Sequence, residues 1–466
     1  MRASIWVTIL VALAVLVGVV FIGQSLIQPN RPLITHAAFS LERITPNADG
    51  DSDVTVFSYG ISRNAQVSLT FQAADGTSFV FRQNEARIPS DYSVAFSGVV
   101  GGYKLPADTT TGVIERRLIP NGQYTWHLQA KDSATGETAE QTGPLEIADA
   151  GSQLPEITDF TLDRHDFSPN QDGIADRVIM NLSLTKPVDS LNVYLEGSDG
   201  QSIFIPEIVS GRKPGEAGQH FFDYDGGIER GVEPPPNGDY TVVAVAQDLE
   251  GQRISQTSKL TITNGGVPQA EIAPQPSNID VVFAPQPYDA KYAVSPTQSG
   301  ELLPSPEFSK DLGFSTVSMQ LGDMLVFKLT IHNYGKVAIR TSGPWPGTVY
   351  DDTQVWGATG VYEQSGSFRV GMMCSTSETD WPWRWAIGSP DTLTKETDPQ
   401  NGNVYYYLPA GGQSEVWGAV HMTQFVKARN PRQCWAGLIH EDVEVVNQRV
   451  GARDVLLVQT GTATGG

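Results

Sequence analysis

Apolar and polar residues alternate in short runs over most of the chain, a pattern typical of β-strands. Three such runs, 177–184, 191–197 and 240–248, are alternating or rich in β-branched residues and are bounded by Asp-Gly, Asn-Gly or Pro turns. No sustained 3.6-residue apolar period, which would indicate an amphipathic helix, occurs around these runs. We therefore predict an all-β fold built from sandwiches of about 100 residues each.

The first 30 residues differ from the rest because they are mostly apolar. Residues 5–27 carry no charged side chain, and a helix of 23 residues exceeds the roughly 30 Å hydrocarbon core of a bilayer. Arg2 precedes them and favours a cytoplasmic N-terminus. A cleaved signal peptide is the alternative, since the uninterrupted apolar part, 9–22, also fits that length. We predict one N-terminal transmembrane helix within residues 1–30, and in both interpretations the remaining chain is exported.

Two parts of the chain repeat one sequence pattern. Residues 39–53 and 160–176 share the order Pro-Asn-x-Asp-Gly-x-x-Asp at an offset of 123, and 119–137 matches 235–252 around Asn-Gly-x-Tyr. So many matched positions over about 110 residues indicate two copies of one domain. The matched positions of the first motif are Pro46, Asn47, Asp49, Gly50 and Asp53 in one copy and Pro169, Asn170, Asp172, Gly173 and Asp176 in the other.

The motif order of the second copy resembles the Ig-like domain of the bacterial flagellar hook-capping protein, a module that recurs in secreted surface proteins. The resemblance rests on Ser168–Asp176, Tyr224–Gly227 and Pro236–Asp248, and the first copy departs from it at 96–106. It implies two Ig-like sandwiches that serve as building blocks. Because an apolar segment stands at the N-terminus in place of the assembly region, no flagellar role is implied.

The last part of the chain differs from the repeats. Residues 264–312 contain eight prolines in 49 positions, which predicts an extended spacer, with a strand at 279–283 as an alternative. Residues 321–335 alternate apolar side chains up to an Asn-x-Gly turn and resemble the adhesion-type sandwiches of bacterial surfaces. The predicted domains are 1–30 (anchor or signal), 33–147 and 154–263 (Ig-like repeats), 264–312 (Pro-rich linker) and 313–461 (Trp-rich β-sandwich).

The acidic loop of each repeat is a candidate Ca²⁺ site. Ca²⁺ prefers oxygen ligands at alternate positions around a sharp Gly turn, as at the start of an EF-hand loop. Position 12 is Ser58 in one copy and Asn181 in the other rather than Glu, and no helices are expected to flank the loop, which excludes a true EF-hand. The alternative is a turn in which Asn and Asp bond their own backbone. The candidate ligands are Asn47, Asp49, Asp51 and Asp53 in the first loop and Asn170, Asp172 and Asp176 in the second.

The chain has two cysteines, Cys374 and Cys434, both in the last predicted domain. In an exported protein such a pair can oxidise, and a bond closing a 60-residue loop would stabilise the fold by roughly 4 kcal/mol in the chain-entropy model. Two buried free thiols are the alternative. No Cys or His spacing is typical of zinc, so we predict a disulfide.

Tryptophan is concentrated in the last domain, which holds seven of the nine. Trp381, Trp383 and Trp385 alternate, so in a strand they would share one face. An exposed strip of these rings would suit sugar rings or an apolar partner, whereas a core face is the default for large aromatics in a sandwich. The three tryptophans are candidate ligand-binding residues, with burial in the core as the alternative.

The net charge and the absence of catalytic motifs exclude several classes of function. A net charge of −21 argues against nucleic-acid binding. No HExxH, GxSxG or P-loop motif is present, so we predict that the chain is not an enzyme and that Ca²⁺ is its only candidate cofactor. The prediction is a single-pass protein of the cell membrane, whose extracellular Ig-like stalk presents a C-terminal binding or adhesion domain to a cell-surface protein or polysaccharide. A carbohydrate-binding protein that uses the tryptophan strip is the alternative.

Overall fold

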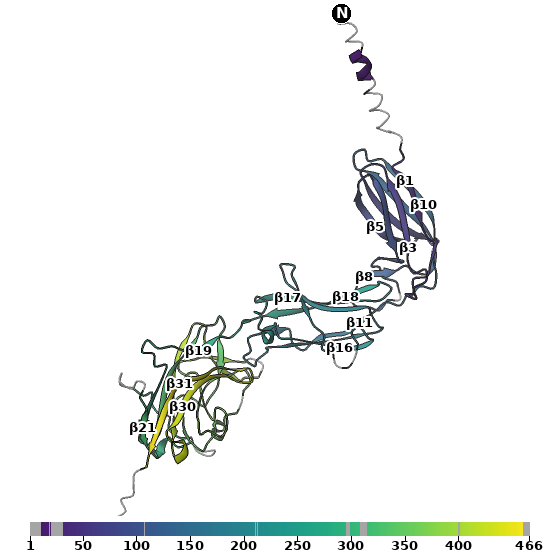
Figure 1. The fold of residues 1–466 in the computed structure, drawn as a ribbon. Helices are drawn as coiled ribbons and strands as arrows, with labels where there is room; N and C mark the ends of the chain where they lie inside the picture. Colours follow the sequence, from purple (N-terminus) through teal and green to yellow (C-terminus); the bar gives the residue numbers. More distant parts are fainter. Residues whose placement is uncertain are drawn as a thin grey trace, which may run out of the picture. The chain divides into compact units, whose positions relative to one another are not determined.

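The computed structural model describes residues 11–17, 19, 31–106, 108–209, 211, 213–294, 299–307, 315–362, 364–398 and 401–459. Within these residues the chain is mostly β-sheet and forms seven sheets (Figure 1). Four short 3₁₀ helices interrupt the strands: η1 (Ile228–Arg230), η2 (Ala290–Tyr292), η3 (Trp356–Thr359) and η4 (Lys427–Arg429). The predicted all-β class is therefore confirmed.

The predicted membrane anchor lies largely outside the described residues. Of the first 30 residues only 11–17 and 19 are described, and these are helical. None of the helical segments in the described part of the chain combines the length and the apolar character needed to span a bilayer.

Two sheets form the first repeat and enclose one apolar core. In order of neighbours, they are β1 (Ile34–Phe39), β3 (Thr55–Ile61) and β6 (Ser90–Phe96), and β2 (Arg43–Ile44), β10 (Thr138–Ile147), β9 (Gly122–Asp132), β4 (Ala65–Ala73) and β5 (Ser78–Arg87). Along β9 every second side chain is buried, including Tyr124, Trp126 and Leu128. Phe57 on β3 packs edge-on against Trp126, with ring centroids 5.2 Å apart, so the core joins the two sheets.

The strands of the second repeat belong to two further sheets, and the first repeat contributes to one of them. The smaller sheet is β11 (Ile157–Leu162), β13 (Val178–Leu184) and β16 (Gly218–Tyr224). The larger is β15 (Ser202–Ile205), β14 (Ser190–Glu196), β17 (Gly238–Gln247), β18 (Arg253–Ile262), β8 (Val113–Leu118) and β7 (Val99–Gly101), with β12 (Asp166–Phe167) also paired to β18. Strands β7 and β8 come from the first repeat, and Ile114 of β8 lies opposite Ile254 of β18. The two repeats thus share one hydrogen-bonded sheet.

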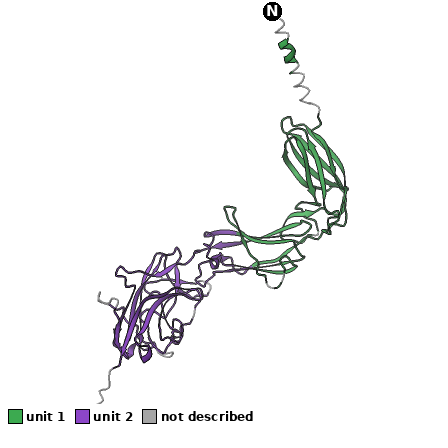
Figure 2. Ribbon diagram, viewed as in Figure 1, with its two compact units in different colours: residues 1–161, 180–222, 241–258 green, residues 162–179, 223–240, 259–466 purple. Residues whose placement is uncertain are grey.

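The chain divides into two compact units, and the division runs through strands of the second repeat (Figure 2). One unit comprises residues 1–161, 180–222 and 241–258, and the other comprises 162–179, 223–240 and 259–466. The pairing of β8 with β18 lies in the first unit. The acidic loop of the second repeat and the whole C-terminal domain lie in the second unit.

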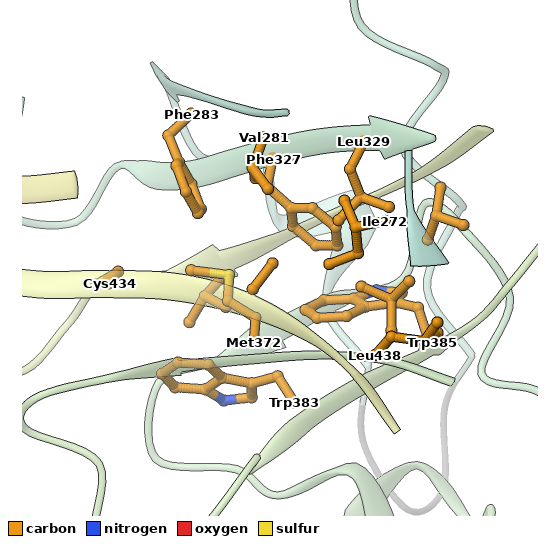
Figure 3. Close-up of a cluster of buried hydrophobic side chains, with 14 of the residues drawn as sticks. Ile272, Val281, Phe283, Phe327, Leu329, Met372, Trp383, Trp385, Cys434 and Leu438 are labelled. Carbon is orange, nitrogen blue, oxygen red and sulfur yellow. The ribbon is translucent and has the colours of Figure 1, made fainter. Parts of the chain in front are cut away.

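Three sheets build the C-terminal domain. The first contains β19 (Ala270–Ile272), β22 (Met324–Asn333), β29 (Gln413–His421) and β24 (Val349–Asp351), with β20 (Val281–Gln286) also paired to β22. The second contains β21 (Val317–Gln320), β31 (Glu444–Val458), β30 (Arg432–His440), β25 (Phe368–Cys374) and β26 (Trp383–Ala386). The third contains β23 (Ile339–Thr341), β28 (Val404–Leu408) and β27 (Thr394–Thr397). Phe327 of β22 and Trp385 of β26 meet in the core, with centroids 4.6 Å apart (Figure 3).

Part of the predicted Pro-rich spacer belongs to this domain. Strands β19 and β20, both within 264–312, are antiparallel to β22. Val281 and Phe283 of β20 are buried in the same core as Phe327. Pro285 is accommodated because β20 pairs with β22 at the margin of the sheet, where a missing N–H breaks no second ladder. The alternative of a strand around 279–283 is therefore the correct one, because its apolar side chains complete the core.

Candidate functional site

In the first repeat, the Pro-Asn-x-Asp-Gly loop and the Asn-Gly turn hold the chain segment that leaves the repeat. The N–H of Gly151 donates to the carbonyl oxygen of Pro46 at 2.9 Å. The N–H of Ala150 donates to Oδ1 of Asn121, also at 2.9 Å. The exit segment is thus bound to two loops of the repeat that it leaves.

The second repeat holds its exit segment through the matching residues. The N–H of Gly266 donates to the carbonyl oxygen of Pro169 at 3.0 Å, and the N–H of Gly265 donates to Oδ1 of Asn237 at 2.9 Å. The repeated motifs therefore fix the direction in which the chain continues. The sequence pattern reveals that these positions are equivalent, but not that they act on the exit segment.

The last aspartate of each acidic loop accepts hydrogen bonds from the backbone of its own loop. Oδ1 of Asp53 accepts from the N–H groups of Asn47 and Ala48, and Oδ2 accepts from Gly50 at 2.7 Å. Burial raises the pKa of Asp53, but these backbone bonds outweigh it and lower that pKa below its usual value. Asp176 accepts in the same way, with its Oδ2 at 2.6 Å from the N–H nitrogen of Gly173.

The other predicted Ca²⁺ ligands also take part in these turns. Oδ1 of Asn47 accepts from the N–H of Asp49, and Oδ1 of Asp49 accepts from the N–H of Asp51. In the second loop, Oδ1 of Asn170 accepts from the N–H of Asp172. Among the described residues, no group of three or more His, Cys, Asp and Glu side chains is arranged to hold a metal ion. These bonds support the turn alternative, and Ca²⁺ binding stays a prediction.

The second acidic loop lies directly against the C-terminal domain. A Cβ atom on Gly173 would lie 2.1 Å from the carbonyl oxygen of Ser365, and one on Gly366 would lie 2.2 Å from the carbonyl carbon of Asp172. Both glycines have positive φ angles, +81° and +78°. At Gly50, the counterpart of Gly173 with φ +90°, a Cβ would meet nothing within 4 Å. The two loops share a conformation, but only the second makes this close backbone contact.

Two buried polar side chains complete the contact between the second loop and the C-terminal domain. Nε2 of His440 donates to the carbonyl oxygen of Gln171 at 2.7 Å, and the hydroxyl of Tyr407 donates to Oδ2 of Asp172 at 3.2 Å. Burial, together with the charge of Asp176, raises the pKa of Asp172 to about 6. Burial lowers the pKa of His440 to about 4. Sequence analysis had no signal for this contact, because its partners are more than 230 residues apart.

A buried ion-pair cluster lies next to His440, at the end of the C-terminal domain that contacts the acidic loop. Nη1 of Arg369 lies 3.1 Å from Oε1 of Glu441, and Nη1 of Arg384 lies 2.6 Å from Oε2 of the same carboxylate. Burial lowers the pKa of Arg369, although the charge of Glu441 opposes this effect. The backbone carbonyl of Glu441 accepts from the N–H of Gly366 at 2.9 Å, and Gly366 in turn lies against Asp172 of the acidic loop.

The three predicted ligand-binding tryptophans do not form an exposed strip. Trp381, Trp383 and Trp385 are 8%, 3% and 0% exposed, and Figure 3 shows Trp383 and Trp385 in the core with Met372. Trp383 pairs with Met372 across β25 and β26. The expectation of a sugar-binding strip was therefore wrong, because the sandwich core takes up these large apolar rings.

Trp381 also lies on a different face from the other two tryptophans. It precedes β26 and has a φ of +49°, so the alternation of a strand does not extend to it. A Cβ on Gly371 would lie 2.8 Å from its ring, and one on Gly437 would lie 2.4 Å away. Gly371 follows Val370, which points into the core, so the ring of Trp381 covers the outer face of β25 and β30.

The predicted disulfide is confirmed. Cys374 at the end of β25 lies opposite Cys434 near the start of β30, with Cα atoms 4.0 Å apart. The loop that follows is held close to this bond, since Oγ of Ser377 accepts from the N–H of Cys374 at 3.0 Å. The disulfide therefore fastens the end of the strand pair that lies away from His440.

A pocket of about 360 Å³ lies among the loops at this disulfide end. Its buried wall includes Trp383, whose Nε1 donates to the carbonyl of Gln354 at 3.0 Å, and Arg432, which donates to the carbonyl of Gln424. Oδ2 of Asp352 accepts from the N–H of Gln424 at 2.9 Å and lies 3.8 Å from Nη1 of Arg432. Burial lowers the pKa of Arg432, against the opposing charge of Asp352. We call this cavity and the residues that line it the disulfide-end pocket.

Comparisons with known proteins add little to this picture. No family model matches the chain, and no curated protein matches it. Among solved structures it matches the crystal structure of dimeric latent PorU from Porphyromonas gingivalis, with 10% sequence identity and a TM-score of 0.18. The match covers 91% of this chain but 32% of that one, so this chain spans about a third of that protein. A TM-score this low carries no argument about fold or function.

Proposed function

We propose that this protein is a non-enzymatic, membrane-anchored protein of the cell exterior, in which two Ig-like repeats position a C-terminal binding domain. The observation that carries the proposal is the placement of two features at opposite ends of β25 and β30. The acidic loop of the second repeat contacts the end at His440, and the disulfide-end pocket lies at the end marked by Cys374. Six residue steps at about 3.3 Å each separate these ends by roughly 20 Å.

The joints between successive domains support a positioning role. The first repeat continues into the sheet of the second through β8 and β18. The fully buried Gln252 reinforces this joint, because its Nε2 donates to the carbonyls of Gly151 at 3.1 Å and Gln153 at 3.0 Å. Within the second compact unit, the close contact between Gly173 and Ser365 holds the acidic loop of the second repeat against the C-terminal domain.

The disulfide supports export, because such bonds persist in oxidising compartments and are rare in the cytosol. The apolar segment of residues 5–27 supplies the signal or anchor for that export. An exported chain with the N-terminus inside would present the disulfide-end pocket outside the membrane.

Thiol labelling in a bacterial expression host tests this topology, because both native cysteines are in the disulfide. Asp380→Cys adds an exposed thiol beside the pocket, and the matched control Ala3→Cys adds one before the apolar segment and keeps Arg2. In intact spheroplasts a membrane-impermeant maleimide should label Asp380→Cys and should label Ala3→Cys only after lysis. Labelling of Asp380→Cys that also requires lysis would contradict the proposal. Carbonate extraction then separates a retained anchor, which stays with the membrane, from a cleaved signal.

A further inference from the structure

We propose that the disulfide-end pocket binds one residue of a neutral saccharide. The inference rests on the proposed function, because it names the ligand class for the disulfide end of the C-terminal binding domain. The volume of about 360 Å³ lies in the range of small-molecule sites and suits one or two sugar rings. Loops at one end of a rigid sandwich are also the usual place for binding residues.

The lining contains both apolar and hydrogen-bonding side chains, which match the C–H face and the hydroxyl groups of a sugar ring. Val355 and Val426 are 44% and 43% exposed and supply the apolar surface of the pocket, whereas Trp383 lies beneath them, only 3% exposed. These groups match the C–H face of a pyranose. Glu378 and Gln424, both exposed, supply a carboxylate and an amide that can accept from and donate to hydroxyl groups.

The charges of the lining favour a neutral ligand over an anion. Arg432 is the one basic residue among the described residues that line the pocket, and its side chain is 4% exposed. Asp352 lies 3.8 Å from it, and the exposed Glu378 adds a second negative charge. The lining therefore has a net charge of −1, counted as one cation against two anions. Glu378 would repel a phosphate or carboxylate, and the guanidinium of Arg432 is too buried to offset that repulsion.

The pocket is built before any ligand arrives, which spares the ligand the cost of ordering the loops. Asp352 fixes the loop after β29 through the N–H groups of Thr423 and Gln424, at 3.1 and 2.9 Å. The disulfide between Cys374 and Cys434 fixes the loop after β25. Two loops of the lining, those after β25 and β29, are thereby restrained.

Saturation-transfer NMR on the full chain, in a detergent without a sugar headgroup, tests the proposal. The probes are glucose, galactose, mannose, N-acetylglucosamine, cellobiose and N,N′-diacetylchitobiose, with glucuronate as the anionic comparison. We expect at least one neutral sugar to bind with a millimolar Kd. Glu378→Gln and Gln424→Ala should each weaken that binding by up to about tenfold, as expected for one lost hydrogen bond.

Both variants should fold, because Glu378 and Gln424 have exposed side chains and the Gln424 bonds to Asp352 and Arg432 are made by its backbone. The matched control is Glu444→Gln, an exposed residue of β31 paired with His440 at the other end of the domain, which should leave sugar binding unchanged. Binding of glucuronate alone, no saturation transfer to any sugar, or equal affinities in all three variants would each overturn the assignment. Thiol labelling at Asp380→Cys reports on presentation independently, so the two proposals can fail separately.

Discussion

The contact between Gly173 and Ser365 can be tested by adding a single methyl group. Gly173→Ala places a Cβ 2.1 Å from the backbone oxygen of Ser365. A backbone atom cannot move aside as the end of a flexible side chain could. Gly50→Ala is the matched control, because Gly50 occupies the same motif position with φ +90° and its Cβ meets nothing within 4 Å. We expect Gly173→Ala to separate the acidic loop from the C-terminal domain, and Gly50→Ala to leave its own loop in place.

The free energies of unfolding follow from the contacts that each variant loses. Both variants adopt a left-handed backbone conformation with a side chain, which costs roughly 1–2 kcal/mol. Separation in Gly173→Ala also removes the hydrogen bonds from His440 and Tyr407, at about 1 kcal/mol each. Rehydration of the Asp172 carboxylate offsets part of that loss. The extra destabilisation of Gly173→Ala over Gly50→Ala is therefore about 1–2 kcal/mol.

The pKa of His440 reports directly on this separation. NMR titration of histidine-labelled protein, with the signal assigned through His440→Gln, should give a pKa near 4 in the wild type and in Gly50→Ala. In Gly173→Ala the ring becomes hydrated and its pKa should rise toward about 6.5. Gly366→Ala, whose Cβ would meet the loop from the other side, should behave likewise. A folded Gly173→Ala protein in which His440 still titrates near pH 4 would refute this account of the joint.

Three further predictions concern pH, the disulfide and the acidic loops. Because the pKa of His440 is lowered, the free energy of unfolding should fall by on the order of 3 kcal/mol as the pH drops from about 6.5 toward 4. Because the pKa of Asp172 is raised, the free energy of unfolding should fall by on the order of 3 kcal/mol as the pH rises from 3.8 through about 6. Urea unfolding should therefore show His440→Gln gaining stability relative to the wild type as the pH falls, and Asp172→Asn losing it, whereas parallel pH profiles would contradict both assignments. Replacing both cysteines with Ser should cost roughly 4 kcal/mol in the chain-entropy model, and an unchanged Tm would show that the bond does not stabilise the fold. Asp53→Ala should cost about 2–3 kcal/mol, since three backbone N–H groups lose their acceptor, and Asp51→Ala much less. If the loops are turns, neither Ca²⁺ nor a chelator changes the Tm, and a rise with Ca²⁺ would instead assign them as cation sites.

Local patterns in the sequence were sufficient for several features of this protein. The alternation along β9 and β22 predicts strands with one buried face, because side chains of a strand point to opposite sides in turn. The repeated motif identifies equivalent loops, because the same turn needs the same Gly and Asn or Asp residues. The pairing of Cys374 with Cys434 followed from the presence of two cysteines in the chain and from the expectation that the chain is exported.

Other features were decided by contacts between residues far apart in the chain. Identical loop motifs gave no indication that Gly173 touches Ser365 while the counterpart Gly50 meets nothing, because the neighbour comes from a domain some 190 residues further on. The spacing of the tryptophans predicted a shared face, but the positive φ of Trp381 ends the strand alternation there. The pocket beside Trp383 arises only where the loops that follow β24, β25 and β29 meet at one end of the sandwich. Periodicity records which face of an element is apolar, whereas the tertiary structure determines what that face or loop packs against.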